Sequence, residues 1–187
     1  MKSKLIAVSG GIGSGKSEVI KYLQSLGYAT LDCDVLAKEA ACRPKVLEQV
    51  LCLLGDEYIN NGQFNRKAIR CKVFADEVLL RKYDNIFFGE VKAMLDERIE
   101  KLVNEKAVFV EISVFDAFDY PWDEVWLVEA NDDTRINRAI ARDKTPRETI
   151  ENIVARQNLC IPFTLKILNN GAIKDLQRQI DNALTRI

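Results

Sequence analysis

The stretch SGGIGSGKSEV, Ser9–Val19, concentrates four glycines between positions 10 and 15. Glycine adopts backbone conformations that other residues avoid, but it also loses the most conformational freedom on folding. A cluster of this kind therefore indicates a place where the chain turns tightly, so that successive backbone amides can point inward. The spacing Gly10-x4-Gly15-Lys16-Ser17 matches the pattern G-x-x-x-x-G-K-[ST], which is typical of a loop that binds phosphate.

The sequence on either side supplies the elements that such a loop requires. The apolar run LIAVS (5–9) predicts a strand before it, and apolar residues at helical spacing predict a helix that ends at Gly27. The run YATLD (28–32) predicts a second strand, which completes a strand–helix–strand unit. In this setting the loop amides and the positive end of the helix form an anion-binding nest.

Two side chains extend this prediction to a nucleotide and its metal ion. We expect the Lys16 ammonium to reach the β- and γ-phosphates and the Ser17 hydroxyl to bind Mg²⁺. The alternative is a glycine-rich turn that binds no ligand. The residues predicted to contact ATP through the loop are Gly11, Ile12, Gly13, Ser14, Gly15, Lys16, Ser17 and Glu18.

Three further apolar runs, at 107–112, 124–130 and 165–168, raise the number of predicted strands to five. Most of the runs are apolar at consecutive positions, which favours a parallel sheet buried on both faces. We therefore predict an α/β fold of the P-loop nucleoside triphosphatase class, with a five-stranded parallel sheet flanked by helices.

The long segment 35–104 contains helical patterns and no convincing strand. Pro44 suits the first position of a helix that ends near Gly55, and Asn61–Gly62 predicts a tight turn. Asn65 is a suitable cap for the next helix. A stripe of apolar residues at helical spacing follows and indicates a buried helix face: Val91, Met94, Leu95, Ile99 and Leu102.

These patterns divide a single domain of 187 residues into three parts. We predict a core at 1–34, 105–131 and 158–187, a helical acceptor-binding subdomain at 35–104, and a lid at 132–157. The lid segment is predicted as one helical stretch, and a last helix is predicted at 173–186.

Composition limits the chemistry and the partners. The net charge is −1, which gives no reason to expect nucleic acid or an acidic membrane as a partner. The chain has no histidine, so acid–base work falls to other groups and a metal would be held by oxygen, as Mg²⁺ is. Five scattered cysteines and no long apolar run predict a cytoplasmic protein. We expect a monomer or a weak homo-oligomer.

Missing motifs narrow the class of phosphate-binding protein. The chain lacks the N-K-x-D and D-x-x-G motifs of GTPases and the L-S-G-G-Q-like stretch of transport ATPases. A small kinase that phosphorylates a small acceptor remains. Such an enzyme needs cations around the transferred group and a carboxylate near the acceptor hydroxyl.

Three carboxylates are candidates for the reaction chemistry. Asp32 and Asp34 follow the second strand, and they would point to the same side if that strand continued. Asp34 could deprotonate an acceptor hydroxyl, or it could simply cap a helix at 35–41. Asp32 could bind Mg²⁺ through water, or it could be an ordinary carboxylate at the end of a strand. Glu111 follows the apolar run AVFV of another strand and is a further candidate for Mg²⁺.

The arginine-rich segment 132–157 is the candidate for a lid over ATP. Arg138 and Arg142 lie one helical turn apart on the same face, where they could contact the phosphates. The alternative is a solvated helix face, with Asp143, Glu148 and Glu151 as ion-pair partners.

The sequence resembles the dephospho-coenzyme A kinase family over nearly its whole length. The resemblance lies in AVSGGIGSGKSEV, LGYATLDCDVLA, NGQFNRKAIRCKVFAD, DEVWLVEANDDTRINRAIARD, IVARQ and ILNNG. It implies ATP-dependent phosphorylation of the ribose 3′-hydroxyl of dephospho-CoA, with Asp34 as base. It further implies a mobile lid that carries Arg138 and the catalytic Arg142, and a nucleotide contact at Asn170.

Three positions depart from the family pattern. Phe88–Gly89 replaces a histidine–proline pair, Asp116 stands at an acidic position that lacks the usual nearby proline, and Phe163–Thr164 replaces an alanine–aspartate pair. Two alternatives therefore stay open. The chain could be a divergent kinase for another small-molecule or nucleotide acceptor, or a nucleotide-binding module without turnover.

Overall fold

The computed structural model describes residues 3–60, 63–73, 75–117, 119–157 and 160–187. The chain forms two compact units. We call residues 1–32 and 101–187 the core unit, and Cys33–Glu100 the insertion unit. No helix in the described ranges is long and apolar enough to cross a bilayer.

The core unit is built on a five-stranded parallel sheet with the order β2-β5-β1-β6-β7. The strands are β1 (Lys4–Ser9), β2 (Ala29–Asp32), β5 (Ala107–Ile112), β6 (Glu124–Glu129) and β7 (Leu165–Leu168). The five strands predicted from the sequence are therefore present, with ends that differ by at most one residue. The first strand of the sequence lies in the centre, which places the loop that follows it at the middle of the sheet edge.

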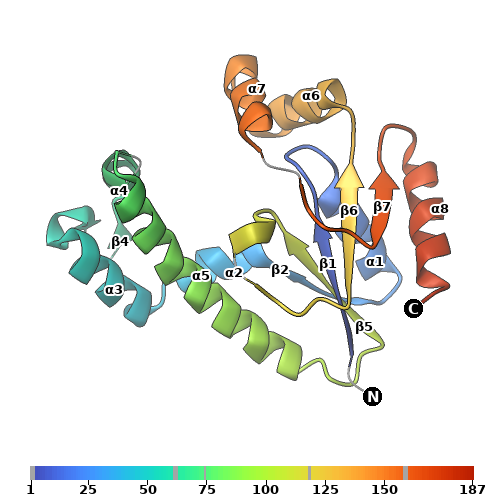
Figure 1. Cartoon of the computed structure of the whole chain (residues 1–187), viewed down its shortest axis with the longest axis horizontal. Coiled ribbons are helices and arrows are strands. Elements are labelled where there is room, and N and C mark those ends of the chain that lie inside the picture. Colours follow the sequence, from blue (N-terminus) through green and yellow to red (C-terminus); the bar gives the residue numbers. More distant parts are fainter. Residues whose placement is uncertain (1–2, 61–62, 74, 118, 158–159) are drawn as a thin grey trace. The chain divides into compact units, whose positions relative to one another are not determined.

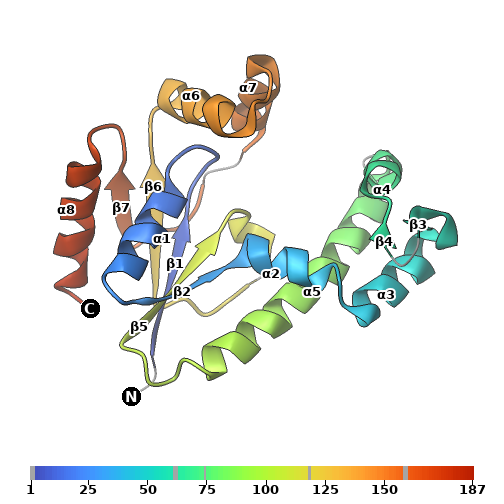
Figure 2. The ribbon, with the colours of Figure 1, turned by 180° about the vertical axis from the view of Figure 1, so that it is seen from behind.

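Two helices pack on one face of this sheet, as Figure 2 shows: α1 (Lys16–Ser25) and α8 (Ile173–Leu184). Alternate strand residues such as Ile6, Val8 and Trp126 face them and are fully buried. Phe109 makes edge-on ring contacts with Trp126 and with Tyr28. Alternation along each strand thus assigns one set of apolar side chains to the helix-covered face.

Two more helices of the core unit lie beyond the carboxyl ends of the strands (Figure 1): α6 (Asp132–Asp143) and α7 (Arg147–Arg156). The sequence predicted a single helical stretch here, and that prediction was wrong. Lys144 adopts a left-handed conformation with φ of 51°, and Pro146 follows two residues later. A proline disfavours helical geometry in the residue before it, so the helix ends and restarts.

The insertion unit is mainly helical, with α2 (Cys33–Ala40), α3 (Pro44–Leu54), α4 (Arg66–Val73) and α5 (Glu77–Glu100). Pro44 begins α3 and Gly55 ends it with φ of 99°, and the Ala68 amide donates to Asn65 Oδ1 at 3.2 Å, all as predicted. The unit also contains a short 3₁₀ turn at Asp56–Tyr58.

Two features of the insertion unit differ from the sequence predictions. An antiparallel pair, β3 (Ile59–Asn60) and β4 (Gln63–Phe64), was missed because strands of two residues are too short to show alternation. The predicted turn at positions 61–62 lies outside the described residues. The apolar stripe of α5 is buried at Val91, Met94 and Leu95, but Leu102 lies beyond the end of the helix.

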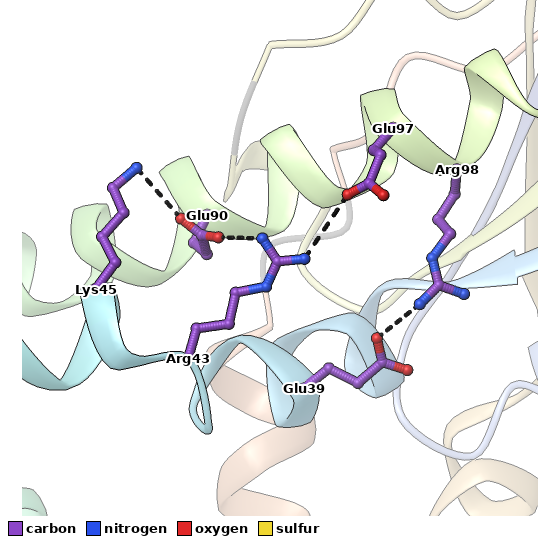
Figure 3. A network of polar contacts seen from close by, with 6 residues as sticks. All are labelled: Glu39, Arg43, Lys45, Glu90, Glu97 and Arg98. Atoms are coloured by element: carbon purple, nitrogen blue, oxygen red, sulfur yellow. Dashed lines mark hydrogen bonds and ion pairs between the residues drawn. The ribbon is translucent and has the colours of Figure 1, made fainter.

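A network of ion pairs joins α2 and α3 to α5 inside the insertion unit (Figure 3). The Glu90 side chain is only 6% exposed, and its carboxylate forms ion pairs with Arg43 Nη1 at 2.6 Å and with Lys45 Nζ at 3.5 Å. Arg43 also approaches Glu97, and Arg98 pairs with Glu39 at 3.0 Å. Because a buried carboxylate is costly without compensation, the contacts with Arg43 and Lys45 offset the burial of Glu90.

Candidate active site

The glycine-rich loop between β1 and α1 is held in conformations that only glycine adopts easily. Gly13 has φ of 73° and Gly15 has φ of 99°, immediately before the first turn of α1. A Cβ atom on Gly13 would overlap the main-chain carbonyl of Arg135, and one on Gly15 would overlap the amide of Asn169. Close packing therefore adds to backbone geometry in requiring glycine at both positions.

Lys16 folds back along this loop. Its Nζ donates to the carbonyl oxygens of Gly10 at 2.9 Å and Gly11 at 3.3 Å, and the residue is only 9% exposed. The amides in the first turn of a helix have no carbonyl partner within that helix. A buried ammonium and a helix N-terminus therefore lie at the same loop, which is a suitable environment for an anion.

Arg135 of α6 holds the loop through hydrogen bonds of its guanidinium. Its guanidinium donates to Ile12 O at 3.1 Å, to Gln157 Oε1 at 2.7 Å and to Asp132 Oδ1 at 3.0 Å. The same Gln157 oxygen accepts the Ile12 amide at 2.9 Å. Arg135 is 5% exposed, so the contacts hold the loop through a buried charge. Sequence reasoning did not identify Arg135 or Gln157 as site residues.

Asn169, at the end of β7, holds the other side of the loop. Its Nδ2 donates to Ser14 O at 2.9 Å, and its Oδ1 lies 3.5 Å from Arg138 Nη2. Asn170, the predicted nucleotide contact, is exposed and accepts the Asn131 amide at 2.7 Å through its Oδ1. The loop contact is thus made by the neighbour of the predicted residue, while the role of Asn170 toward a nucleotide stays a prediction.

Arg138 presents a buried donor at the loop. Its Nη1 has no hydrogen-bond partner among the described residues, and it lies 3.8 Å from where a Cβ on Gly15 would be. Buried polar atoms are almost always paired, so an unpaired nitrogen at this place is costly without a ligand. A bound phosphate would supply the missing acceptor, so the residues present fit an anionic nucleotide.

The carboxyl edge of the sheet brings the predicted metal-binding residues together. Ser17 Oγ lies 3.2 Å from Glu111 Oε1, and Asp32 on β2 is the register partner of Glu111 on β5. No group of three or more carboxylate or cysteine side chains suited to a metal occurs among the described residues. Mg²⁺ commonly keeps several waters and is held by few protein ligands plus substrate phosphates, so this sparse set of oxygens fits it.

The structure places Arg142 in the last turn of α6. Its side chain is 61% exposed and forms a two-point contact with Asp143 at 2.6 and 2.7 Å. The hydrogen bond from Arg142 lowers the pKa of Asp143. Glu151 pairs with Arg147 at 2.7 Å. Part of the arginine-rich segment therefore forms the surface ion pairs named as the alternative, whereas Arg135 donates a hydrogen bond to the loop and Arg138 contacts Asn169 beside it.

Comparison with known proteins decides the family. The sequence profile of the dephospho-CoA kinase family matches residues 4–160. The chain belongs to the dephospho-CoA kinase family. This finding confirms the resemblance detected in the sequence.

Relatives and solved structures agree with that membership. The chain is 30% identical to a dephospho-CoA kinase of Fusobacterium nucleatum, with 97% of each chain covered. It is 31% identical to one of Thermus thermophilus, covering 98% of this chain and 91% of the relative. A crystal structure from Thermus thermophilus covers 100% of this chain and 99% of its own, with a TM-score of 0.87 and 29% identity.

More distant structures share the fold alone. A dephospho-CoA kinase from Campylobacter jejuni has a TM-score of 0.63 at 20% identity, covering 98% of this chain and 97% of its own. A shikimate kinase from Acinetobacter baumannii has a TM-score of 0.53 at 15% identity, covering 98% and 94%. The predicted P-loop kinase fold is therefore confirmed.

Asp34, the predicted base, lies in the insertion unit. Helix α2 begins at Cys33, so Asp34 stands in its first turn and is exposed. The expectation that Asp32 and Asp34 point to one side was wrong in its reason, because the strand ends at Asp32 and alternation does not extend beyond it. Asp34 is likewise not the residue before the helix, as the capping alternative required.

The residues that depart from the pattern of dephospho-CoA kinases lie in different local settings. Thr164 Oγ1 accepts the Val125 amide at 3.0 Å and donates to the Val125 carbonyl at 3.1 Å, which ties the chain before β7 to β6. Phe163 is half exposed, with Lys166 Nζ 5.1 Å from its ring centre. Phe88–Gly89 continues α5, and Asp116 is exposed in a 3₁₀ turn at Phe115–Ala117.

Proposed function

We propose that this protein transfers the γ-phosphoryl group of ATP to the ribose 3′-hydroxyl of dephospho-CoA, giving coenzyme A and ADP. The observation that carries the proposal is the match to the dephospho-CoA kinase family over residues 4–160. The loop geometry supports it, because Lys16 and the buried, unpaired Arg138 Nη1 supply positive charge around a helix N-terminus.

In the proposed reaction the loop binds the triphosphate. Main-chain amides of the loop and the first turn of α1 donate to phosphate oxygens, and the Lys16 ammonium exchanges its carbonyl partners for the β- and γ-phosphates. Arg138 Nη1 donates to a further phosphate oxygen. Arg135, Gln157 and Asn169 position the loop and do not contact the reacting atoms.

Ser17 would hold Mg²⁺ through its hydroxyl, Asp32 would hold the ion through water, and Glu111 would be a further ligand. When bound, the ion neutralises charge on the phosphate oxygens and orients the terminal phosphate. The Ser17–Glu111 contact of 3.2 Å supports this assignment, since both oxygens already lie within reach of one another.

Asp34 would accept the proton of the 3′-hydroxyl as its oxygen bonds to the γ-phosphorus and the bond to ADP breaks. Arg142 would leave Asp143 and stabilise charge on the transferred group. This contact would raise the transfer rate to the extent that it is stronger in the transition state than in the complex with bound substrates. We place this reaction in the cytoplasm, with a small-molecule substrate and no nucleic acid or membrane partner.

The test is product formation by the purified protein with ATP, Mg²⁺ and dephospho-CoA. The proposal predicts equal amounts of ADP and coenzyme A, with the new phosphate on the 3′-oxygen by phosphorus NMR. Phosphorylation of another acceptor but not of dephospho-CoA would favour a divergent kinase. Tight ATP binding without a product from any acceptor would favour a nucleotide-binding module.

A further inference from the structure

The insertion unit contains a pocket of about 340 Å³ between α2, α4, α5 and β4. Three aromatic side chains line it: Phe64, Tyr83 and Phe87. The Phe87 ring centre lies 4.9 Å from that of Tyr83 and 6.1 Å from that of Phe64. Adjacent aromatic rings favour a flat, conjugated ligand, because ring stacking adds to the apolar surface that is buried.

One carboxylate stands among these apolar side chains. Asp84 lines the pocket from the same face of α5 as Tyr83 and Phe87, and no described residue forms a hydrogen bond or an ion pair with it. Burial raises the pKa of Asp84. An ionised carboxylate only accepts hydrogen bonds, so a ligand that compensates Asp84 must present a donor.

One wall of the pocket comes from the helix that carries the predicted base, Asp34. Ala37, Lys38 and Ala41 line the pocket from α2 and the residue just after it. Ala37 and Lys38 follow Asp34 by three and four positions, so these three residues share one face of α2. At 1.5 Å per residue, Lys38 lies about 6 Å along the helix axis from Asp34.

We propose that this pocket holds the adenine ring of the acceptor, with the Asp84 carboxylate accepting a hydrogen bond from the exocyclic amino group. The inference rests on the proposed function, since it takes dephospho-CoA as acceptor and Asp34 as base. The contact with Asp84 would let the enzyme select its acceptor by the identity of the nucleobase.

Covalent connection and charge favour adenine over the other parts of dephospho-CoA. The adenine is attached to C1′ of the ribose, and a single ring carbon, C2′, separates that atom from C3′, which bears the hydroxyl. The pantetheine arm is separated from that hydroxyl by the 5′-carbon and two phosphates. The diphosphate is a poor occupant, because Lys38 is the only cation lining the pocket as the structure describes it and Asp84 would repel the phosphates.

A double-mutant cycle tests the contact. Turnover is measured with dephospho-CoA and with an analogue whose base is unsubstituted purine, which lacks the amino group. We expect the wild type to prefer adenine by about tenfold or more in kcat/KM, as for a lost hydrogen bond to a charged group. Asp84→Leu, of similar size, should reduce that preference to less than about twofold, with the KM for ATP unchanged.

Asp56→Leu is the matched control, because Asp56 is an exposed aspartate of the same unit outside the pocket. It should keep the full preference for adenine. A wild type with equal kcat/KM for the two acceptors would overturn the inference without any variant. A preference for adenine that persists in Asp84→Leu would overturn the inference as well. So would a variant in which kcat/KM falls by the same factor for both acceptors. Failure of the wild type to phosphorylate dephospho-CoA would instead contradict the proposed function.

Discussion

Replacing Arg135 by methionine should loosen the phosphate-binding loop without removing a group that contacts a substrate. The variant keeps an unbranched side chain of similar length but loses hydrogen bonds to Ile12, Gln157 and Asp132. Each hydrogen bond of a charged group contributes about 1.5–3 kcal/mol. The Ile12–Gln157 bond survives and Asp132 is exposed, so we expect a net loss of about 3 kcal/mol.

Thermal unfolding without ligand and the KM for ATP are the two measurements. For a chain of this size 1 kcal/mol corresponds to about 2–4 °C, so Tm should fall by about 6–12 °C. The KM for ATP should rise about tenfold or more, because Ile12 and the loop are no longer fixed for phosphate.

Arg178→Met is the matched control. Arg178 lies on α8 of the same unit, and its ion pair with Asp175 is largely exposed. Its loss should change stability by less than about 0.5 kcal/mol and leave the KM for ATP unaltered. If Arg135→Met matched this control in both measurements, the loop would not depend on the buried guanidinium and the reasoning would fail.

Two further predictions concern the insertion unit. Arg43→Met should lower the free energy of unfolding in urea by about 3 kcal/mol, because Glu90 stays buried with only the more distant Lys45 as a partner. The control is Arg81→Met, since the ion pair of Arg81 is exposed. Equal stability of the two variants would contradict this prediction. Because burial raises the pKa of Asp84 from 3.8, the folded state binds this proton more tightly than the unfolded state. The free energy of unfolding should therefore fall as pH rises from about 4 through the raised pKa of Asp84. Asp84→Asn should flatten this pH dependence when unfolding is measured across pH. An unchanged pH profile in the variant would show that burial of the carboxylate has no energetic effect.

The strands and the loop could be predicted because they are encoded locally. Consecutive apolar residues define a buried parallel strand, and the glycine pattern with Lys16 and Ser17 occurs within eight positions. The cap at Asn65 and the helix start at Pro44 also depend on neighbours in sequence. In each case the residues that decide the local structure lie close to one another in the sequence.

The loop supports could not be predicted, because they join residues that are distant in sequence. Gln157 meets Ile12 across 145 positions, and Asn169 meets Ser14 across 155. Arg135 belongs to a helix rich in charged residues, and only tertiary packing decides that it is buried while Arg142 is exposed. The glycine pattern indicates the turn of the loop, but it does not indicate which side chains support that turn.

The most direct test of the account compares Asp34→Asn with the wild type in a single turnover of ATP and dephospho-CoA. We predict that the rate of phosphoryl transfer falls by about 100-fold or more, while the dissociation constant of ATP changes by less than about twofold. The exposed Asp56→Asn should behave as the wild type in both measurements. A near-normal transfer rate in Asp34→Asn would contradict the claim that Asp34 activates the acceptor hydroxyl.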